Sequence, residues 1–129
     1  MHTIKAIKDL INIQGKKFQK GEIVTQKQHA LQCAYYAKRD GNHDEFVIAC
    51  MLHDIGVLLG RKHRLKKMGH GIGIANHEGI GAKWLQQRGF SNYIVSMVKN
   101  HVNAKRYQCQ VNPNYYKKLS PLEKETLTF

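Results

Sequence analysis

Two residue types that bind metal ions stand side by side near the middle of this 129-residue chain, where His53 is followed at once by Asp54. The apolar stretch before them, residues 46–52, predicts a buried helix that delivers both residues to its end. Neighbouring helical residues point about 100° apart, so they can face one point only where the helix frays, and Gly56 is expected to end it. Imidazole nitrogen and carboxylate oxygen are typical metal ligands, and a carboxylate can bridge two ions.

Three other histidines, His29, His77 and His101, share the setting of His53, since each lies in or against an apolar helical stretch. The four are equally spaced along the chain, which we interpret as coincidence because no matching sequence repeat accompanies it. One such histidine is more often a satisfied core residue, but four beside a carboxylate are hard to bury together without a cation. We therefore predict as metal ligands His29, His53, Asp54, His77 and His101. The remaining histidines are expected on the surface or in loops: His2, His43, His63 and His70.

Helical periodicity and helix-end signals predict the elements that position these ligands. A first amphipathic helix is expected over residues 3–15. The next carries His29 and begins with a capping box formed by Thr25 and Gln28. The expected caps of the later helices are Asp44, Asn76 and Ser91, with helix ends at Gly41 and Gly89 and a Gly-rich basic loop over residues 60–75. Helical structure is expected to be interrupted at Asn112–Pro113, and a last helix is expected to start at Ser120. With no strand pattern, the fold class is all-α, a bundle of about five to six helices.

Composition indicates one domain, because 42% hydrophobic residues suffice for one modest core. We divide it into an N-terminal helix and connector (1–21), a metal-binding core (22–111) and the start of a C-terminal helical segment (112–129). The net charge of +12 favours an anionic partner, whether a small phosphate-bearing molecule, nucleic acid or an acidic surface. Nucleic acid is a weaker interpretation, because the basic run of residues 61–67 lacks interleaved aromatic residues.

The cysteines and the absence of export signals indicate a cytoplasmic protein. Three scattered cysteines without a CxxC pair are typical of a reducing compartment, and Cys33 and Cys50 are expected to be buried thiols. No signal peptide and no membrane-spanning apolar run are visible, so no membrane partner is expected.

Four motifs together resemble the HD-domain superfamily and, within it, the mixed-valence di-iron oxygenases. They are Val24–Gln32, Leu52–Gly56, Ala75–Glu78 and His101–Tyr107, and the resemblance runs from about residue 22 to residue 127. It implies a helical fold and cleavage, with O₂, of the carbon–phosphorus bond of small hydroxyphosphonates such as 2-amino-1-hydroxyethylphosphonate.

The same resemblance implies roles for individual residues. Two iron ions (Fe²⁺/Fe³⁺) are implied, one held by His29, His53 and a bridging Asp54, the other by His77 and His101. Glu22 matches a residue that contacts the substrate's amino end, and Lys105 matches one that binds its phosphonate. The chain departs from the family in three places: Gln19 replaces a tyrosine, Val57 replaces a histidine, and a downstream aspartate after a Gln-Gly-Gly segment does not occur in the sequence.

Two other functions stay open. His and Asp ligands also suit Mn²⁺, Zn²⁺ or another divalent metal, so a metal-dependent phosphohydrolase is the alternative activity. The third possibility is a shortened relative that binds metal or a phosphate-bearing ligand without catalysis. A cysteine-nucleophile enzyme is disfavoured, because neither Cys33 nor Cys50 has a setting that would activate a thiolate.

Overall fold

A computed structural model of the chain describes residues 2–18, 23–64, 76–111 and 117, and the side chains of these residues except 103–111. No strand occurs among them, so the predicted all-α class is confirmed. The described part holds six α-helices and a short 3₁₀ turn: α1 (His2–Ile13), η1 (Gln14–Lys16), α2 (Gln26–Arg39), α3 (Asp44–Leu52), α4 (Ile55–Lys62), α5 (His77–Gln87) and α6 (Asn92–Val111).

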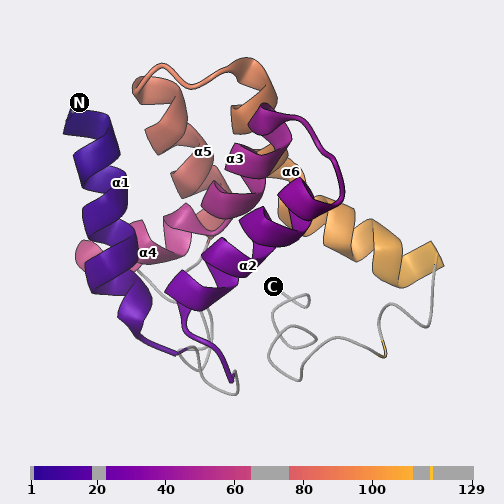
Figure 1. The fold of residues 1–129 in the computed structure, drawn as a ribbon, viewed down its shortest axis with the longest axis horizontal. Helices are drawn as coiled ribbons and strands as arrows, with labels where there is room; N and C mark the ends of the chain where they lie inside the picture. Colours follow the sequence, from indigo (N-terminus) through magenta and orange to yellow (C-terminus); the bar gives the residue numbers. More distant parts are fainter. Residues whose placement is uncertain (1, 19–22, 65–75, 112–116, 118–129) are drawn as a thin grey trace.

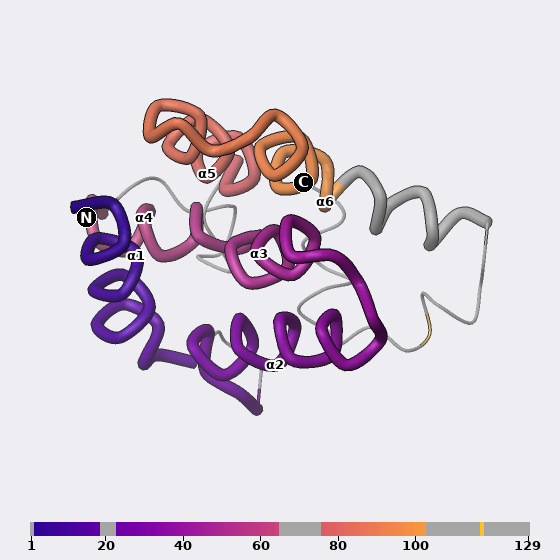
Figure 2. The backbone as a smooth tube through the Cα atoms, turned by 45° about the horizontal axis from the view of Figure 1, so that its top comes forward, coloured from indigo at the N-terminus to yellow at the C-terminus, as the bar shows by residue number. Residues whose placement is uncertain are grey.

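The helices form a layered bundle in which α3 is central. It packs against α2 on one side and against α6 on the other, and α6 pairs with α5 (Figure 1, Figure 2). The first helix, α1, lies across one end of the bundle, where it contacts α4 and α2. The chain thus contains two helical hairpins, α2–α3 and α5–α6, which meet along α3 and α6.

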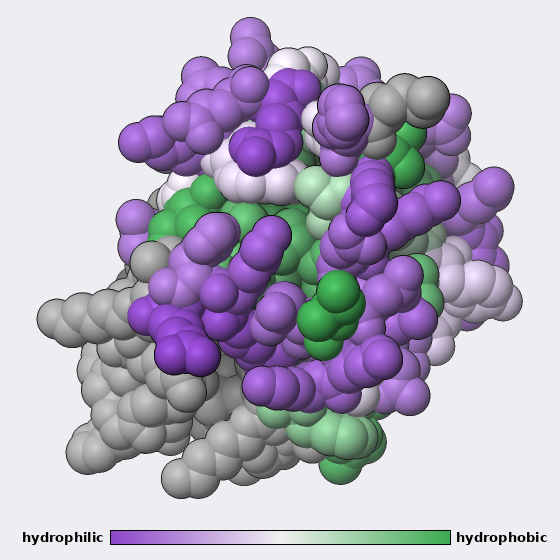
Figure 3. All heavy atoms as spheres, turned by 90° about the vertical axis from the view of Figure 1, so that its left-hand side faces the viewer, coloured by the Kyte–Doolittle hydropathy of each residue, from purple (hydrophilic) through white to green (hydrophobic). Residues whose placement is uncertain are grey.

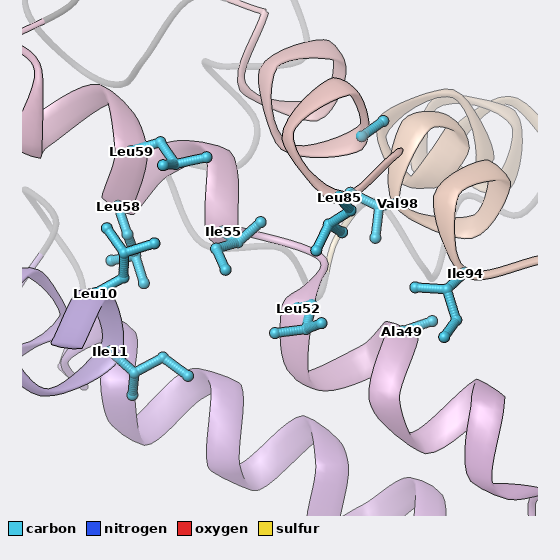
Figure 4. Close-up of a cluster of buried hydrophobic side chains, with 11 residues drawn as sticks. Leu10, Ile11, Ala49, Leu52, Ile55, Leu58, Leu59, Leu85, Ile94 and Val98 are labelled. Carbon is cyan, nitrogen blue, oxygen red and sulfur yellow. The ribbon is translucent and has the colours of Figure 1, made fainter. Parts of the chain in front are cut away.

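The hydrophobic core lies where α1, α3, α4, α5 and α6 converge (Figure 4). Its most deeply buried side chains are Leu52, Leu85 and Val98, at 1%, 0% and 0% exposure. Burying such a side chain stabilises the fold by about 1.5–3 kcal/mol relative to leaving it in water. Because these residues belong to α3, α5 and α6, the core fixes the two hairpins against each other.

The two hairpins turn in the same way. Gly41 follows α2 and Gly89 follows α5, both with φ of 82°, a left-handed conformation that glycine adopts without a Cβ clash. In each turn the next backbone N–H donates to a carbonyl five residues back, from Asn42 to Ala37 and from Phe90 to Leu85, both at 3.2 Å. The predicted helix ends at both glycines are confirmed.

The helix starts confirm the predicted cap positions Thr25, Asn76 and Ser91 and correct the one at Asp44. The capping box of Thr25 and Gln28 is present, and the Ser91 hydroxyl accepts from the Ile94 N–H. The cap of α3, however, is His43, whose Nδ1 accepts from the Phe46 N–H, while Asp44 is the first helical residue. Asn76 precedes α5 in a left-handed conformation, and its side chain makes no capping hydrogen bond.

The prediction that Gly56 ends a helix and that a loop begins at Gly60 is wrong, because residues 55–62 form α4. Ile55, Leu58 and Leu59 bury their side chains in the core, and this burial makes a helix of a stretch too short to show periodicity. Gly56 lies where α4 crosses α5, and a Cβ there would stand 1.8 Å from the carbonyl oxygen of His77. The glycine is therefore required for close approach of two helices rather than for a helix end.

Several predictions concern the outside of the molecule or residues that are not described. Cys33 and Cys50 are both partly exposed, so the prediction of buried thiols is wrong. The face in Figure 3 is mostly hydrophilic with smaller hydrophobic areas, in keeping with the high charge. Within the described ranges, no helix has the length and apolar character needed to cross a membrane. Three other predicted features lie outside the described residues: the rest of the basic loop (65–75), the helix interruption at Asn112–Pro113 and the helix start at Ser120.

Candidate metal centre

The five predicted ligands come together in the middle of the bundle, although they belong to different elements. His29 lies in the first turn of α2, and His53 and Asp54 form the turn between α3 and α4. His77 is the first residue of α5, and His101 lies midway along α6. The expectation that His53 and Asp54 face one point from the end of a helix is therefore met, since α3 ends at Leu52.

The carboxylate of Asp54 divides the cluster into two halves. Its Oδ2 lies 3.3 Å from Nε2 of both His29 and His53, and its Oδ1 lies 3.4 Å from Nε2 of both His77 and His101. Within each pair, the two Nε2 atoms are 3.1 Å apart. We call His29, His53 and Oδ2 the first half-site, and His77, His101 and Oδ1 the second half-site.

These spacings match those of ligands that share an ion. Nitrogen and oxygen ligands lie about 2.0–2.2 Å from a transition metal, so two of them at angles of 90° to 109° stand about 2.8–3.6 Å apart. All six distances in the two half-sites, 3.1 to 3.4 Å, fall in this range. Each half-site could therefore hold one metal ion, with Asp54 between them.

In three of the rings, the outer nitrogen, Nδ1, has a partner outside the centre, and this contact orients the ring so that Nε2 faces the centre. Nδ1 of His53 lies 2.6 Å from the Cys50 carbonyl oxygen, and Nδ1 of His101 lies 2.7 Å from that of Val98. A carbonyl oxygen only accepts, so each Nδ1 carries a hydrogen, and Nε2 presents a lone pair whenever the ring is neutral. Nδ1 of His77 is paired in the same sense with Glu78, at 3.5 Å. In neutral rings, the converging lone pairs and the carboxylate repel one another, and either protons on the rings or metal ions between them would relieve this repulsion.

The charges of the first half-site depend on one another. The hydrogen bond with Asp54, followed by that with Cys33, raises the pKa of His29 to about 10 against the effect of burial. Burial acts to raise the pKa of the Asp54 carboxyl, but the charge of His53 and hydrogen bonds from the surrounding histidines hold it well below its usual range. The centre therefore carries an ionised carboxylate and, without an ion, a strongly held proton that a metal must displace.

The sequence did not indicate roles for two residues beside the ligands. Cys33 lies one turn after His29 on α2, with its Sγ 3.9 Å from both ring nitrogens. Glu78 directly follows His77 and lies beside its outer nitrogen. The spacing of four residues between His29 and Cys33 was the visible signal, because such residues share a helix face.

Not every predicted residue can be placed. Glu22 and His70 lie outside the described residues, and so does the side chain of Lys105, although α6 continues past it one turn after His101. Of the other histidines, His63 is exposed after α4, as predicted, and His43 is exposed at its capping position.

Known proteins resemble this chain over most of its length. The sequence profile described as HD domain matches residues 27–127. An uncharacterized protein of Acanthamoeba polyphaga mimivirus is 38% identical over 84% of this chain and 49% of its own length. The [1-hydroxy-2-(trimethylamino)ethyl]phosphonate dioxygenase (glycine-betaine-forming) of Leisingera caerulea is 33% identical, covering 92% of this chain and 59% of its own. The hydroxymethylphosphonate dioxygenase of Gimesia maris is 36% identical, covering 91% and 57%. The chain thus spans about half the length of the curated relatives it matches.

Proposed function

Because the chain belongs to the HD domain family, we propose that its two half-sites hold a pair of iron ions and that it oxidatively cleaves small hydroxyphosphonates. The observation that carries the proposal is the position of Asp54. Each of its oxygens faces its own pair of imidazole nitrogens, at 3.3 Å in the first half-site and 3.4 Å in the second. A single carboxylate that serves two histidine pairs is suited to bridging two ions.

The proposed substrates are phosphonates with a hydroxyl group on the carbon bonded to phosphorus. Both named dioxygenase relatives carry such a compound in their names. A net charge of +12 favours the approach of a dianion. Glu22 and Lys105 are the proposed substrate-binding residues, with the Lys105 ammonium offsetting the phosphonate charge. For hydroxymethylphosphonate, one O₂ would yield formate, phosphate and a proton, which balances the reaction.

The residues of the chain have separate parts in this proposal. When bound, iron supplies the one-electron chemistry with O₂ that no side chain offers. Asp54 would hold the two ions at a fixed separation. The carbonyls of Cys50 and Val98 orient His53 and His101 and increase the basicity of their inner nitrogens. The four rings would bind as neutral imidazoles, because only the unprotonated Nε2 is a ligand.

The proposal is tested by loading the protein with Fe²⁺ without oxygen and counting bound iron by metal analysis and Mössbauer spectroscopy. We expect two ions per chain, and equal O₂ uptake and phosphate release with hydroxymethylphosphonate. His53→Ala should abolish both, whereas the matched variant His63→Ala should retain them, because His63 is exposed and outside the centre.

Two outcomes would contradict the proposal. Protein with two bound irons that consumes no O₂ with hydroxyphosphonates would exclude the oxygenase activity. Turnover of a phosphomonoester under anaerobic conditions, with Mn²⁺ or Zn²⁺ in the centre, would establish the phosphohydrolase alternative instead.

A further inference from the structure

The two half-sites are built alike but differ in the residue one turn after the first histidine. In both hairpins the first histidine is followed twelve residues later by a left-handed glycine and 24 residues later by the second histidine. When the two hairpins are aligned on His29 and His77, the residue one turn after the first histidine is Cys33 on α2 and Gly81 on α5. Gly81 cannot offer a ligand, and its backbone packs directly on Gly56. Only the first half-site therefore has a further metal-binding side chain at this position.

Cys33 lies close enough to belong to the first half-site. Its Sγ is 3.9 Å from both ring nitrogens of His29, and the ligand atoms of His29, Cys33 and His53 all lie within 4.8 Å of one another. A thiolate lies about 2.3 Å from a metal ion, so sulfur and nitrogen on one tetrahedral ion stand about 3.6 Å apart. The observed 3.9 Å to Nε2 is slightly wider, and the equal distance to Nδ1 places the sulfur beside the ring, so binding requires Cys33 to rotate its side chain towards the Nε2 side.

We propose that Cys33, as a thiolate, is the fourth protein ligand of the ion in the first half-site, so that the two ions have different ligand sets. The proposal rests on the proposed function, because it presumes that the half-sites bind metal. The first ion would have two imidazoles, a carboxylate oxygen and a sulfur, and the second would have two imidazoles and a carboxylate oxygen. Metal binding then releases the Cys33 thiol proton to solvent, and the first half-site prefers the more thiophilic metal.

Cobalt(II) provides a readout that does not depend on activity, because thiolate coordination gives a sulfur-to-metal charge-transfer band in the near ultraviolet. We expect this band in the wild-type protein with two bound cobalt ions. Cys33→Ser should lose the band while keeping cobalt in the second half-site. The matched variant Cys50→Ser should keep it, since a serine retains the backbone carbonyl that orients His53. Circular dichroism would establish that both variants are folded.

A second measurement uses the wild-type chain alone. Peptide mapping after brief alkylation reports each cysteine separately. Cobalt should slow the labelling of Cys33 at least tenfold, reversibly with a chelator, and leave that of Cys50 unchanged.

The outcomes separate this inference from the proposed function. Two bound cobalt ions without a sulfur band, a band that survives in Cys33→Ser, or unprotected Cys33 in loaded protein would each overturn the role of Cys33 and leave the paired half-sites intact. Failure of the wild-type protein to bind cobalt at all would overturn both.

Discussion

Replacing Gly56 with alanine tests whether the crossing of α4 and α5 positions the second half-site. The added Cβ would stand 1.8 Å from the His77 carbonyl oxygen, whereas ordinary contact begins at 3.4 Å, so His77 must move by about 1.6 Å. Its Nε2 now lies 3.4 Å from Asp54 Oδ1. If this movement carried Nε2 directly away from Oδ1, the distance between these two atoms would rise to about 5 Å. One ion can bind two such ligands only if they are at most about 4.4 Å apart.

We therefore expect Gly56→Ala to lose the second ion and to keep the first. The overpacking should also lower the free energy of unfolding by about 1–3 kcal/mol. Equilibrium dialysis with Co²⁺ would count the ions, and urea unfolding would measure stability. We expect the affinity of the second half-site to fall at least tenfold and that of the first to change less than threefold, a split that global destabilisation would not produce.

Gly89→Ala is the matched control. The same chemical change at φ of 82° costs about 1–2 kcal/mol, yet no atom lies within 4 Å of the added Cβ. This variant should lose similar stability and retain both ions. If Gly56→Ala binds two ions as tightly as the wild type, or if Gly89→Ala loses the second ion as well, the helix crossing does not position His77.

Three further outcomes are expected. Glu78→Gln should weaken the second half-site by about 10–100-fold in Co²⁺ titrations, because the outer nitrogen of His77 loses its charged partner; unchanged affinity would show that Glu78 does not tune the ring. The raised pKa of His29, about 10, means that its proton stabilises the ion-free fold fully below pH 6.5 and that this stabilisation is lost as the pH rises towards 10. Metal affinity should rise over the same range, with proton release measured by calorimetry in two buffers; pH-independent binding would contradict this. Chelation should lower the thermal midpoint, since an ion present at about 100 times its Kd adds about 2.7 kcal/mol to stability, and an unchanged midpoint would mean that the described centre binds no ion.

Residue types and local helix signals predicted much of the fold and of the centre. The all-α class, the capping box at Thr25 and the turns at Gly41 and Gly89 all follow from interactions within a few residues. The five centre residues could be named because four imidazoles on apolar helices, with a carboxylate beside one of them, are costly to bury together unless a cation joins them. That they hold metal stays a proposal.

What the sequence could not predict depends on tertiary packing. The helix at 55–62 forms because Ile55, Leu58 and Leu59 reach a core shared with distant helices, and no local period reveals that. Gly56 is typical of a helix end when only its neighbours in sequence are considered, but in the folded chain it admits the His77 backbone. His43 caps α3 through a ring nitrogen, a role usually taken by a side-chain oxygen.

The equal spacing of the histidines, interpreted as coincidence from the sequence, has a structural reason in two of its three intervals. From His29, α2 runs ten residues, about 15 Å, to Arg39, and after a four-residue turn α3 returns nine residues to the level of His53. From His77, α5 runs the same number of residues away from the centre, and α6 returns antiparallel to it as far as His101 (Figure 1). The middle interval includes residues outside the described ranges, so the same reason cannot be given for it.

A helical hairpin of this kind requires a certain helix length and a left-handed glycine at the turn, but it constrains few other side chains. For this reason no sequence repeat accompanies the equal spacing. The carboxylate of Asp54 has two equivalent oxygens, and each receives the histidine pair of one hairpin. The centre is thus nearly symmetric in its nitrogen and oxygen ligands. Among the described residues, the chemical differences between the two half-sites come from neighbouring positions: Cys33 beside the first, where α5 has Gly81, and Glu78 beside the second, where α2 has Ala30.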